Sequence, residues 1–289
     1  MKLDGRREST NVDDRRSGST IAKAGGIGLG GVIIIGLITL LMGGDPTDVI
    51  RNVQEMGGGM TTQVDPNWTP SPEEEELATF AKQILAGTED VWTKIFAQNG
   101  RTYEPPRLVL FSNAVQSGCG GATSSSGPFY CSADRCVYID LSFFTSMKRQ
   151  IGADGDFAYA YVIAHEVGHH VQNLLGTLGQ AHSQMARSNQ AQSNQISVRL
   201  ELQADFYAGI WGYYDNKMFG SLEEGDIDEA LNAASKIGDD YLQKKSQGYT
   251  IPESFNHGTS AQRHKWLKKG LTTGNLSLGD TFSPAYRDL

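Results

Sequence analysis

One long apolar stretch dominates the hydropathy pattern near the start of the chain. Residues 24–44 read AGGIGLGGVIIIGLITLLMGG and hold no charged residue among 21. A helix of that length, rising about 1.5 Å per residue, spans a hydrocarbon core roughly 30 Å thick. A buried core helix and a cleaved signal peptide are the alternatives, but no face is polar and no A-x-A-like cleavage site follows. We therefore predict an uncleaved transmembrane signal anchor at residues 24–44.

The charges on either side of this stretch predict its orientation. Residues 1–23 hold six basic and four acidic residues, whereas the far side begins with Asp45 and Asp48. Because basic flanks stay on the cytoplasmic side, we expect residues 1–23 to be a cytoplasmic tail. The chain is then a single-pass protein of the inner membrane that contacts lipid through residues 24–44. Its remaining part faces the periplasm or the exterior.

Beyond the apolar stretch, the pattern predicts a tether and one globular domain. Residues 45–72 are the expected flexible linker, because residues 57–72 are rich in Gly, Thr and Pro and lack periodicity. The domain should begin near Ser71, where a capping residue, a proline and a run of glutamates open a helix. The predicted domain, residues 73–289, is long enough for one substantial core.

Helical patterns prevail within this domain. Only two strands are expected from β-branched and apolar content, at residues 106–112 and 136–141. The polar residues 177–195 are predicted to be a loop or a helical approach to the next element. The expected helices cover residues 72–86, 88–98, 143–151, 155–175, 195–216, 225–246 and 260–270. The chain therefore predicts an α+β domain, predominantly helical, with a small sheet.

Composition and cysteine content narrow the classes of function. The chain has 25 Lys and Arg against 33 Asp and Glu, a net charge of −8, so we expect no nucleic-acid partner. Cys119 and Cys131 lie in a Gly- and Ser-rich stretch, with Cys136 close behind. A disulfide among them, with Cys119 and Cys131 as the candidate pair, fits an oxidising compartment. The odd count leaves one thiol over.

Candidate chemistry is concentrated in AYVIAHEVGHHVQNLLG, within an expected helix. His165 and His169 are one turn apart on one helix face, so both imidazoles can bind one zinc ion. An incidental pair of histidines is the alternative. Glu166 is placed to accept a proton from the water that attacks a peptide bond and to pass it to the departing amine. Gly168 costs about 1 kcal/mol relative to alanine, so we expect substrate or an opposing helix to approach closely there.

A catalytic zinc needs a third protein ligand, and the helix expected at residues 195–216 offers one. Glu201 and Asp205 are one turn apart among apolar residues, where carboxylates are costly without partners. Zinc would neutralise Glu201, and a hydrogen bond from a zinc-binding histidine would satisfy Asp205. The alternative is an acidic stripe that pairs with Arg199 or Lys217.

Several motifs together resemble one known family. HEVGHH, ELQADFYAG and HGTSAQR, with the opening MKLDGRRES and the segments GPFYC, VYIDLSFF and IGDDYLQ, look like the bacterial putative neutral zinc metallopeptidase family. That family is membrane-anchored and similar to the gluzincins, zincin-like proteases whose third ligand is a glutamate on a second helix. The resemblance implies zinc ligation by His165, His169 and Glu201. It also implies that Glu166 is the catalytic acid and base and that Asp205 orients a ligand.

Two further segments are candidates for work at the active site. His257 precedes the last expected helix, and in related gluzincins a histidine or tyrosine outside the ligand set stabilises the oxyanion. Local packing or capping is the alternative role for His257. Residues 136–142 alternate between two faces, so we expect an edge strand that aligns an extended substrate. An ordinary core strand would show the same pattern.

These expectations define two functions of different classes. The first is a membrane-anchored zinc metalloendopeptidase that acts on peptides or proteins. The second is a membrane-tethered zinc-binding scaffold or adaptor with little or no peptidase activity. Such a scaffold needs the three metal ligands but has no need of Glu166, so replacing Glu166 by glutamine separates the two hypotheses.

Overall fold

The computed structural model describes residues 1–20, 62–64 and 68–289. The predicted membrane anchor, residues 24–44, and most of the predicted linker, residues 45–72, lie outside these residues. Within the described part of the chain, no helix combines the length and the apolar content that a bilayer crossing requires. The anchor and the single-pass topology therefore stay predictions.

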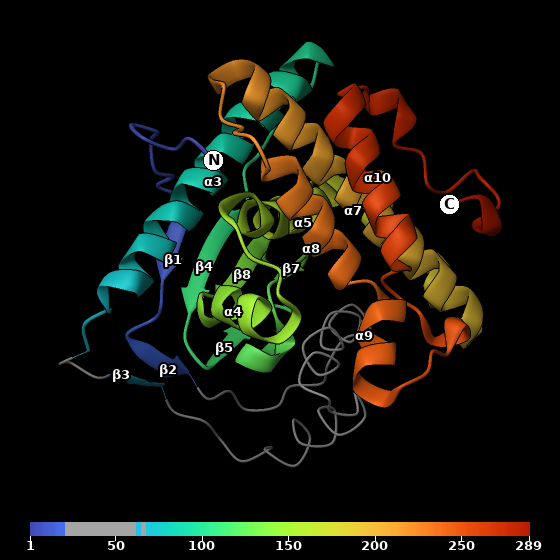
Figure 1. Cartoon of the computed structure of the whole chain (residues 1–289), viewed down its shortest axis with the longest axis horizontal. Helices are drawn as coiled ribbons and strands as arrows, with labels where there is room; N and C mark the ends of the chain where they lie inside the picture. Colours follow the sequence, from blue (N-terminus) through green and yellow to red (C-terminus); the bar gives the residue numbers. More distant parts are fainter. Residues whose placement is uncertain (21–61, 65–67) are drawn as a thin grey trace.

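A four-stranded sheet lies beside the helices (Figure 1). In spatial order its strands are β1 (Val12–Asp14), β4 (Arg107–Phe111), β8 (Cys136–Asp140) and β7 (Phe129–Cys131). The first three run parallel, whereas β7 is antiparallel to β8 and forms one edge of the sheet. Two ribbons accompany it, β2 (Gly18–Thr20) with β3 (Thr62–Val64), and β5 (Ala114–Ser117) with β6 (Gly120–Thr123).

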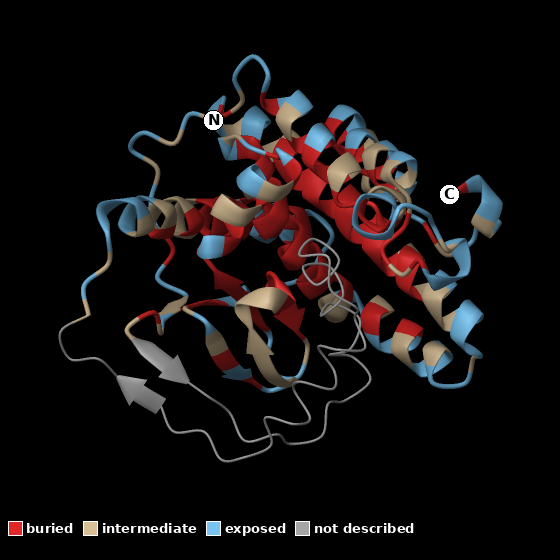
Figure 2. Ribbon diagram, turned by 60° about the horizontal axis from the view of Figure 1, so that its bottom comes forward, coloured by how far each residue is buried: buried red, intermediate tan, exposed pale blue. Residues whose placement is uncertain are grey.

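Helices form the larger part of the described structure. They are α3 (Pro72–Gln98), α4 (Ser142–Ser146), α5 (Asp156–Leu175), α6 (Thr177–Met185), α7 (Gln190–Phe219), α8 (Asp226–Lys236), α9 (Asp239–Gln247) and α10 (Ser260–Thr273). A π-helical segment, Met147–Ile151, extends α4. Figure 2 shows buried residues along the long central helices and in the sheet. The predicted α+β fold, predominantly helical with a small sheet, is confirmed.

The first helix of the domain begins where its capping signal predicts. The Glu74 backbone N–H donates to Ser71 Oγ at 3.2 Å, and the Ser71 N–H donates to the Glu74 carboxylate at 2.8 Å. The break predicted between residues 86 and 88 is wrong, because α3 runs straight through Gly87. A Cβ at Gly87 would lie 2.8 Å from the Asp215 carboxylate, so this glycine serves a close approach and ends no helix.

Two other predicted boundaries differ from the structure. The helix expected at residues 225–246 is two helices, α8 and α9, since Asp239 starts a new helix. The Asp239 carboxylate accepts the backbone N–H groups of residues 256–258, which ties the start of α9 to the loop before α10. Residues 177–195, expected as a loop or a helical approach, are mostly helix, in α6 and the start of α7.

The strand expected at the edge of the sheet is a central one. β8 lies between β4 and β7, and all five of its residues are buried. Its polar side chains are satisfied inside the fold: the Tyr138 hydroxyl donates to Asp134 at 2.7 Å, and Asp140 accepts the backbone N–H of Asn113 at 2.9 Å. Alternation of apolar and polar residues therefore did not mark an exposed face, and the edge strands of this sheet are β1 and β7.

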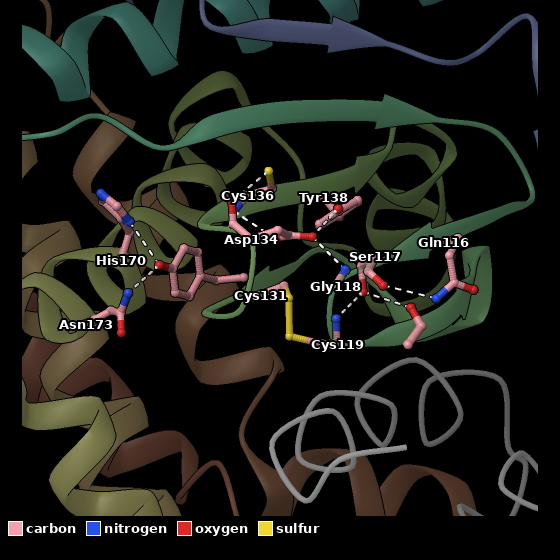
Figure 3. The surroundings of a disulfide bond; sticks show 12 residues. Gln116, Ser117, Gly118, Cys119, Cys131, Asp134, Cys136, Tyr138, His170 and Asn173 are labelled. Carbon is pink, nitrogen blue, oxygen red and sulfur yellow. Dashed lines mark hydrogen bonds between the residues drawn. A yellow bond between two sulfur atoms is a disulfide. The ribbon is translucent and has the colours of Figure 1, made fainter. Parts of the chain in front are cut away.

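The Cys119 and Cys131 sulfur atoms lie 2.08 Å apart, which is a disulfide distance (Figure 3). This pair connects the turn between β5 and β6 to the end of β7. Cys136 is the remaining thiol, and burial raises its pKa to about 11. The Cys136 thiol therefore stays protonated at neutral pH.

Residues 1–20, which we call the N-terminal strap, pack against the domain formed by residues 68–289. Their strand β1 pairs in parallel with β4, with Val12 opposite Leu108 and Asp14 opposite Leu110. The cytoplasmic location predicted for residues 1–23 stays a prediction.

Candidate metal centre and active site

Helices α5 and α7, which carry the predicted metal ligands, pack closely against each other. They approach at Gly168, where a Cβ would lie 2.9 Å from the carbonyl oxygen of Ala204 and 3.1 Å from its Cα. Of the two partners predicted for Gly168, substrate or an opposing helix, the structure shows the helix. A glycine at this point lets the two helix backbones come near enough for their side chains to share one site.

The close approach brings His165, His169 and Glu201 together. One ligand atom from each residue lies within 4.8 Å of the other two, and all three residues are buried. The His165 Nε2 atom is 3.2 Å from Glu201 Oε2, and the His169 Nε2 atom is 3.4 Å from Glu201 Oε1. Two imidazole nitrogens and one carboxylate form the donor set of a catalytic zinc site, which leaves a fourth position for water or substrate.

The Nδ1 atom of each of the two histidines, which faces away from the proposed metal position, contacts a side-chain oxygen. His165 Nδ1 is 2.8 Å from Asp205 Oδ1, and His169 Nδ1 is 2.9 Å from Gln172 Oε1. Such bonds fix the orientation of each ring and leave Nε2 to the ion. Asp205 was a sequence candidate, whereas Gln172 was missed. Its position three residues after His169, on the same helix, is the signal that could have found it.

Asp205 is buried together with the groups that neutralise it. Nε and Nη2 of Arg263 each donate to one of its oxygens at 2.9 Å, and the Tyr161 hydroxyl donates at 2.6 Å. Arg199 donates instead to backbone carbonyls near the end of the chain, and the Lys217 ammonium lies over two tyrosine rings. The acidic stripe paired with Arg199 or Lys217 is therefore not what the structure shows.

The electrostatics of the centre favour a bound cation. Burial opposes the charged form of His165, but Asp205 and Glu201 raise its pKa to about 10. Burial also opposes ionisation of Glu201, yet His169 and His165 hold its pKa well below the usual range. The carboxylates thus attract positive charge to the point between the imidazoles, as a proton or as a metal ion. The donor set and its charge both fit Zn²⁺.

Glu166 lies beside the predicted metal ligands. It lines the same cavity as His165, His169 and Glu201, and it is only 6% exposed. Its Oε2 atom has no hydrogen-bond partner within the described chain. Burial raises the pKa of Glu166, although the neighbouring imidazoles oppose that change. A buried carboxylate left without a partner is costly, which indicates a group that a ligand completes.

His257 lines this cavity too, and α9 positions it. Its Nδ1 atom is 3.1 Å from Asp239 Oδ1, while Asp239 Oδ2 accepts the His257 backbone N–H at 2.7 Å. Burial opposes the protonated imidazole, but Asp239 raises its pKa above the usual value. Because Asp239 occupies Nδ1, Nε2 is the ring atom available to a ligand.

Apolar side chains complete the wall of the cavity. They are Pro128, Phe143, Val162 and Ile237. Pro128 immediately precedes β7, so the edge strand of the sheet begins at the wall of the metal centre. The cavity therefore combines charged and apolar lining residues, and the chain leads from it directly into β7.

A helix with the H-E-x-x-H pattern and a glutamate from a second helix define the class of zinc metallopeptidases. The chain belongs to the putative neutral zinc metallopeptidase family, whose model matches residues 1–282. This finding confirms the family predicted from the motifs and identifies zinc as the cofactor that the His165, His169 and Glu201 group is positioned to bind.

Relatives of this chain are found in several bacteria. The uncharacterized protein YpfJ of Escherichia coli (strain K12) is 47% identical over 288 residues, which cover 98% of this chain and 99% of that protein. The uncharacterized protein Rv2575 of Mycobacterium tuberculosis (strain ATCC 25618 / H37Rv) is 46% identical over 193 residues, 63% of this chain and 64% of that protein. No solved structure matches the chain.

Proposed function

We propose that this protein is a zinc-dependent metalloendopeptidase that hydrolyses peptide bonds in peptides or proteins. The observation that supports it most is Glu166, a buried carboxylate beside the three metal ligands with an oxygen that no described residue binds. A peptidase uses such a group to move protons. The alternative, a zinc-binding scaffold or adaptor, needs the ligands but gains nothing from this costly carboxylate.

The side chains of the cavity divide the chemistry among them. When held by His165, His169 and Glu201, zinc lowers the pKa of a water molecule and polarises the scissile carbonyl. Glu166 accepts one proton from the attacking water and delivers it to the amine that leaves, so the carboxylate is restored. His257, oriented by Asp239, donates a hydrogen bond to the oxyanion that forms on the attacked carbonyl.

We propose that β7, rather than β8, aligns the substrate. One edge of the sheet is β7, where no described strand pairs on the side away from β8. The three residues of β7 are buried, so an added peptide would have to displace the groups that cover this edge. An extended peptide adds to such an edge by main-chain hydrogen bonds. Pro128 leads from β7 into the cavity, where Phe143, Val162 and Ile237 accept an apolar side chain next to the scissile bond.

Replacing Glu166 by glutamine tests this function. Glu166→Gln keeps the shape and the three ligands, so zinc content should equal that of the wild type. Hydrolysis of a peptide mixture, followed by mass spectrometry, should fall by about 10²–10⁴-fold because glutamine transfers no proton. Unchanged hydrolysis would contradict the peptidase proposal and support the scaffold. Glu201→Ala should lose both zinc and activity, and a variant that kept them would refute the third ligand.

We also propose that residues 24–44 attach the protein to a membrane, with the catalytic domain on its periplasmic or extracellular side. The uncharged run of 21 residues and the disulfide distance between Cys119 and Cys131 support this location. The full chain should sediment with membranes and require detergent for release. A full chain that remained in the supernatant with reduced cysteines would contradict the proposal.

A further inference from the structure

The N-terminal strap completes the core of the domain at β4. Leu108, Val109 and Leu110 of β4 are fully buried, and they form the strand to which β1 adds in parallel. Without β1, the strand β4 would be an open edge of the sheet, with unpaired backbone groups beside a hydrophobic core. The domain is therefore built to hold the strap.

Two arginines of the strap bind carboxylates of the domain. Arg6 forms a bidentate pair with Asp215 of α7, with Nη2–Oδ1 at 2.8 Å and Nη1–Oδ2 at 3.3 Å. Arg16 is itself buried and binds Glu75 of α3 at 3.0 Å. Asp215 is 1% exposed, and a carboxylate at that depth is stable only with a partner. Arg6 is the partner that the structure provides.

Glu89 in α3 shows the same dependence on the strap. It is buried, and its side chain binds three strap residues: the Ser9 hydroxyl at 2.6 Å, the Asn11 amide at 2.7 Å and the Arg7 guanidinium at 2.9 Å. Within the described residues, every hydrogen-bond and ion-pair partner of the Glu89 carboxylate therefore comes from the strap. Removing the strap would leave Glu89 with a desolvated charge and no donor.

Gly87 gives independent support for the docked strap. A Cβ at this position in the middle of α3 would lie 2.8 Å from Asp215 Oδ1 and 3.0 Å from Arg6 Nη2. A glycine inside a helix costs about 1 kcal/mol relative to alanine, so its presence calls for a close neighbour. The neighbour here is the ion pair between the strap and α7.

Both ends of the segment between strap and domain also meet at one place. Strand β2, at the end of the strap, pairs antiparallel with β3, with Gly18 opposite Val64 and Thr20 opposite Thr62. Thr20 and Thr62, the described residues on either side of residues 21–61, therefore lie opposite each other in one ribbon, which Figure 1 shows as β2 and β3. A single bilayer crossing within that segment would place its two ends about 30 Å apart, on opposite sides.

We infer that residues 1–20 and residues 68–289 form one folded unit on the same side of the membrane. Three basic residues of the strap, Arg6, Arg7 and Arg16, bind the acidic groups Asp215, Glu89 and Glu75 of the domain. They do not act as a cytoplasmic retention signal in the folded protein.

Cysteine labelling of the full chain in intact cells tests the shared side. Thr10→Cys places a thiol on an exposed strap residue, and Thr272→Cys places one on an exposed residue of α10. Wild type is the blank, because its one thiol, Cys136, is buried. A membrane-impermeant maleimide should label both variants under the same conditions. Labelling of Thr10→Cys only from the face opposite to Thr272→Cys would overturn the inference.

Ser9→Cys tests docking separately from sidedness. Ser9 is 5% exposed and its neighbour Thr10 is exposed, so the two thiols differ in accessibility only while the strap is docked. Ser9→Cys should react at least about tenfold more slowly than Thr10→Cys, the ratio that about 1.4 kcal/mol of docking free energy produces. Equal rates in the folded full chain would show an undocked tail and refute the inference.

Discussion

The contact between Gly168 and α7 yields a prediction with a matched control. Gly168→Ala adds a Cβ that would lie 2.9 Å from the Ala204 carbonyl oxygen. Gly179 in α6 is also a helical glycine, but it has nothing within 4 Å of the position of its missing Cβ. Gly179→Ala is therefore the same chemical change without the steric conflict. It should raise the free energy of unfolding by up to about 1 kcal/mol.

The size of the effect at Gly168 follows from two opposing contributions. The helix propensity of alanine again favours the folded state by about 1 kcal/mol. Against this, a carbon placed 2.9 Å from a backbone oxygen must push α5 and α7 apart, and overpacking of this kind costs about 1–3 kcal/mol. Gly168→Ala should therefore be less stable than Gly179→Ala by about 1–3 kcal/mol in metal-free chemical denaturation.

The same displacement should weaken zinc binding. α5 carries His165 and His169, while α7 carries Glu201 three residues before Ala204, so separating the helices changes the ligand spacing. Zinc sites tolerate deviations of about 0.2 Å, so we expect affinity to fall at least about tenfold in competition with a chromophoric chelator. The reasoning is refuted if Gly168→Ala binds zinc like the wild type, or if it is stabilised as Gly179→Ala is.

Three further predictions concern groups around the centre. Tyr130→Phe should cost about 1–3 kcal/mol in thermal or urea unfolding, because it leaves the buried His170 and the half-buried Asn173 without the hydroxyl they contact at 3.0 Å. Tyr103→Phe is the control, since its hydroxyl has no partner in the described chain. Burial lowers the pKa of His170 to about 4, so the folded protein holds this imidazole neutral while the unfolded chain protonates it below about pH 6.5. The free energy of unfolding should therefore fall by about 2 kcal/mol between pH 7 and pH 5. His170→Gln should reduce that loss. Chelation should lower the free energy of unfolding by about 2.7 kcal/mol when free zinc had been 100 times its Kd, and Glu201→Ala should show no such change.

The ligand set was predictable because its information is local. His165 and His169 share one face of a helix through their spacing alone, and Glu201 and Asp205 repeat that spacing on a second helix. Gln172 belongs to the same local pattern and could have been included. The bond between Asp205 and Arg263 joins residues 58 positions apart, so no local pattern in the sequence pairs them.

The sheet shows where patterns in short segments fail. β4 and β8 were predicted, but β7 has only three residues, and all three are buried. A segment of that length shows no alternation and resembles any other apolar run. β8 did alternate, yet its polar side chains bind within the fold instead of facing solvent. Alternation shows that polar and apolar side chains lie on opposite faces of a strand. It does not show whether water or other protein groups contact the polar face.

The charged residues of the strap also bind partners within the fold that a local sequence pattern does not contain. Arg6 was counted toward a cytoplasmic flank, but its partner Asp215 is 209 residues away, and a charge count over the flank cannot contain that partner. The sequence does contain one trace of the contact, namely the glycine in the middle of α3. Gly87 and Gly168 both stand where alanine would favour the helix, and both are explained by a neighbour from a distant segment. An unexplained glycine inside a predicted helix is thus a sequence signal for long-range packing, in one case at the metal centre and in the other beneath the strap.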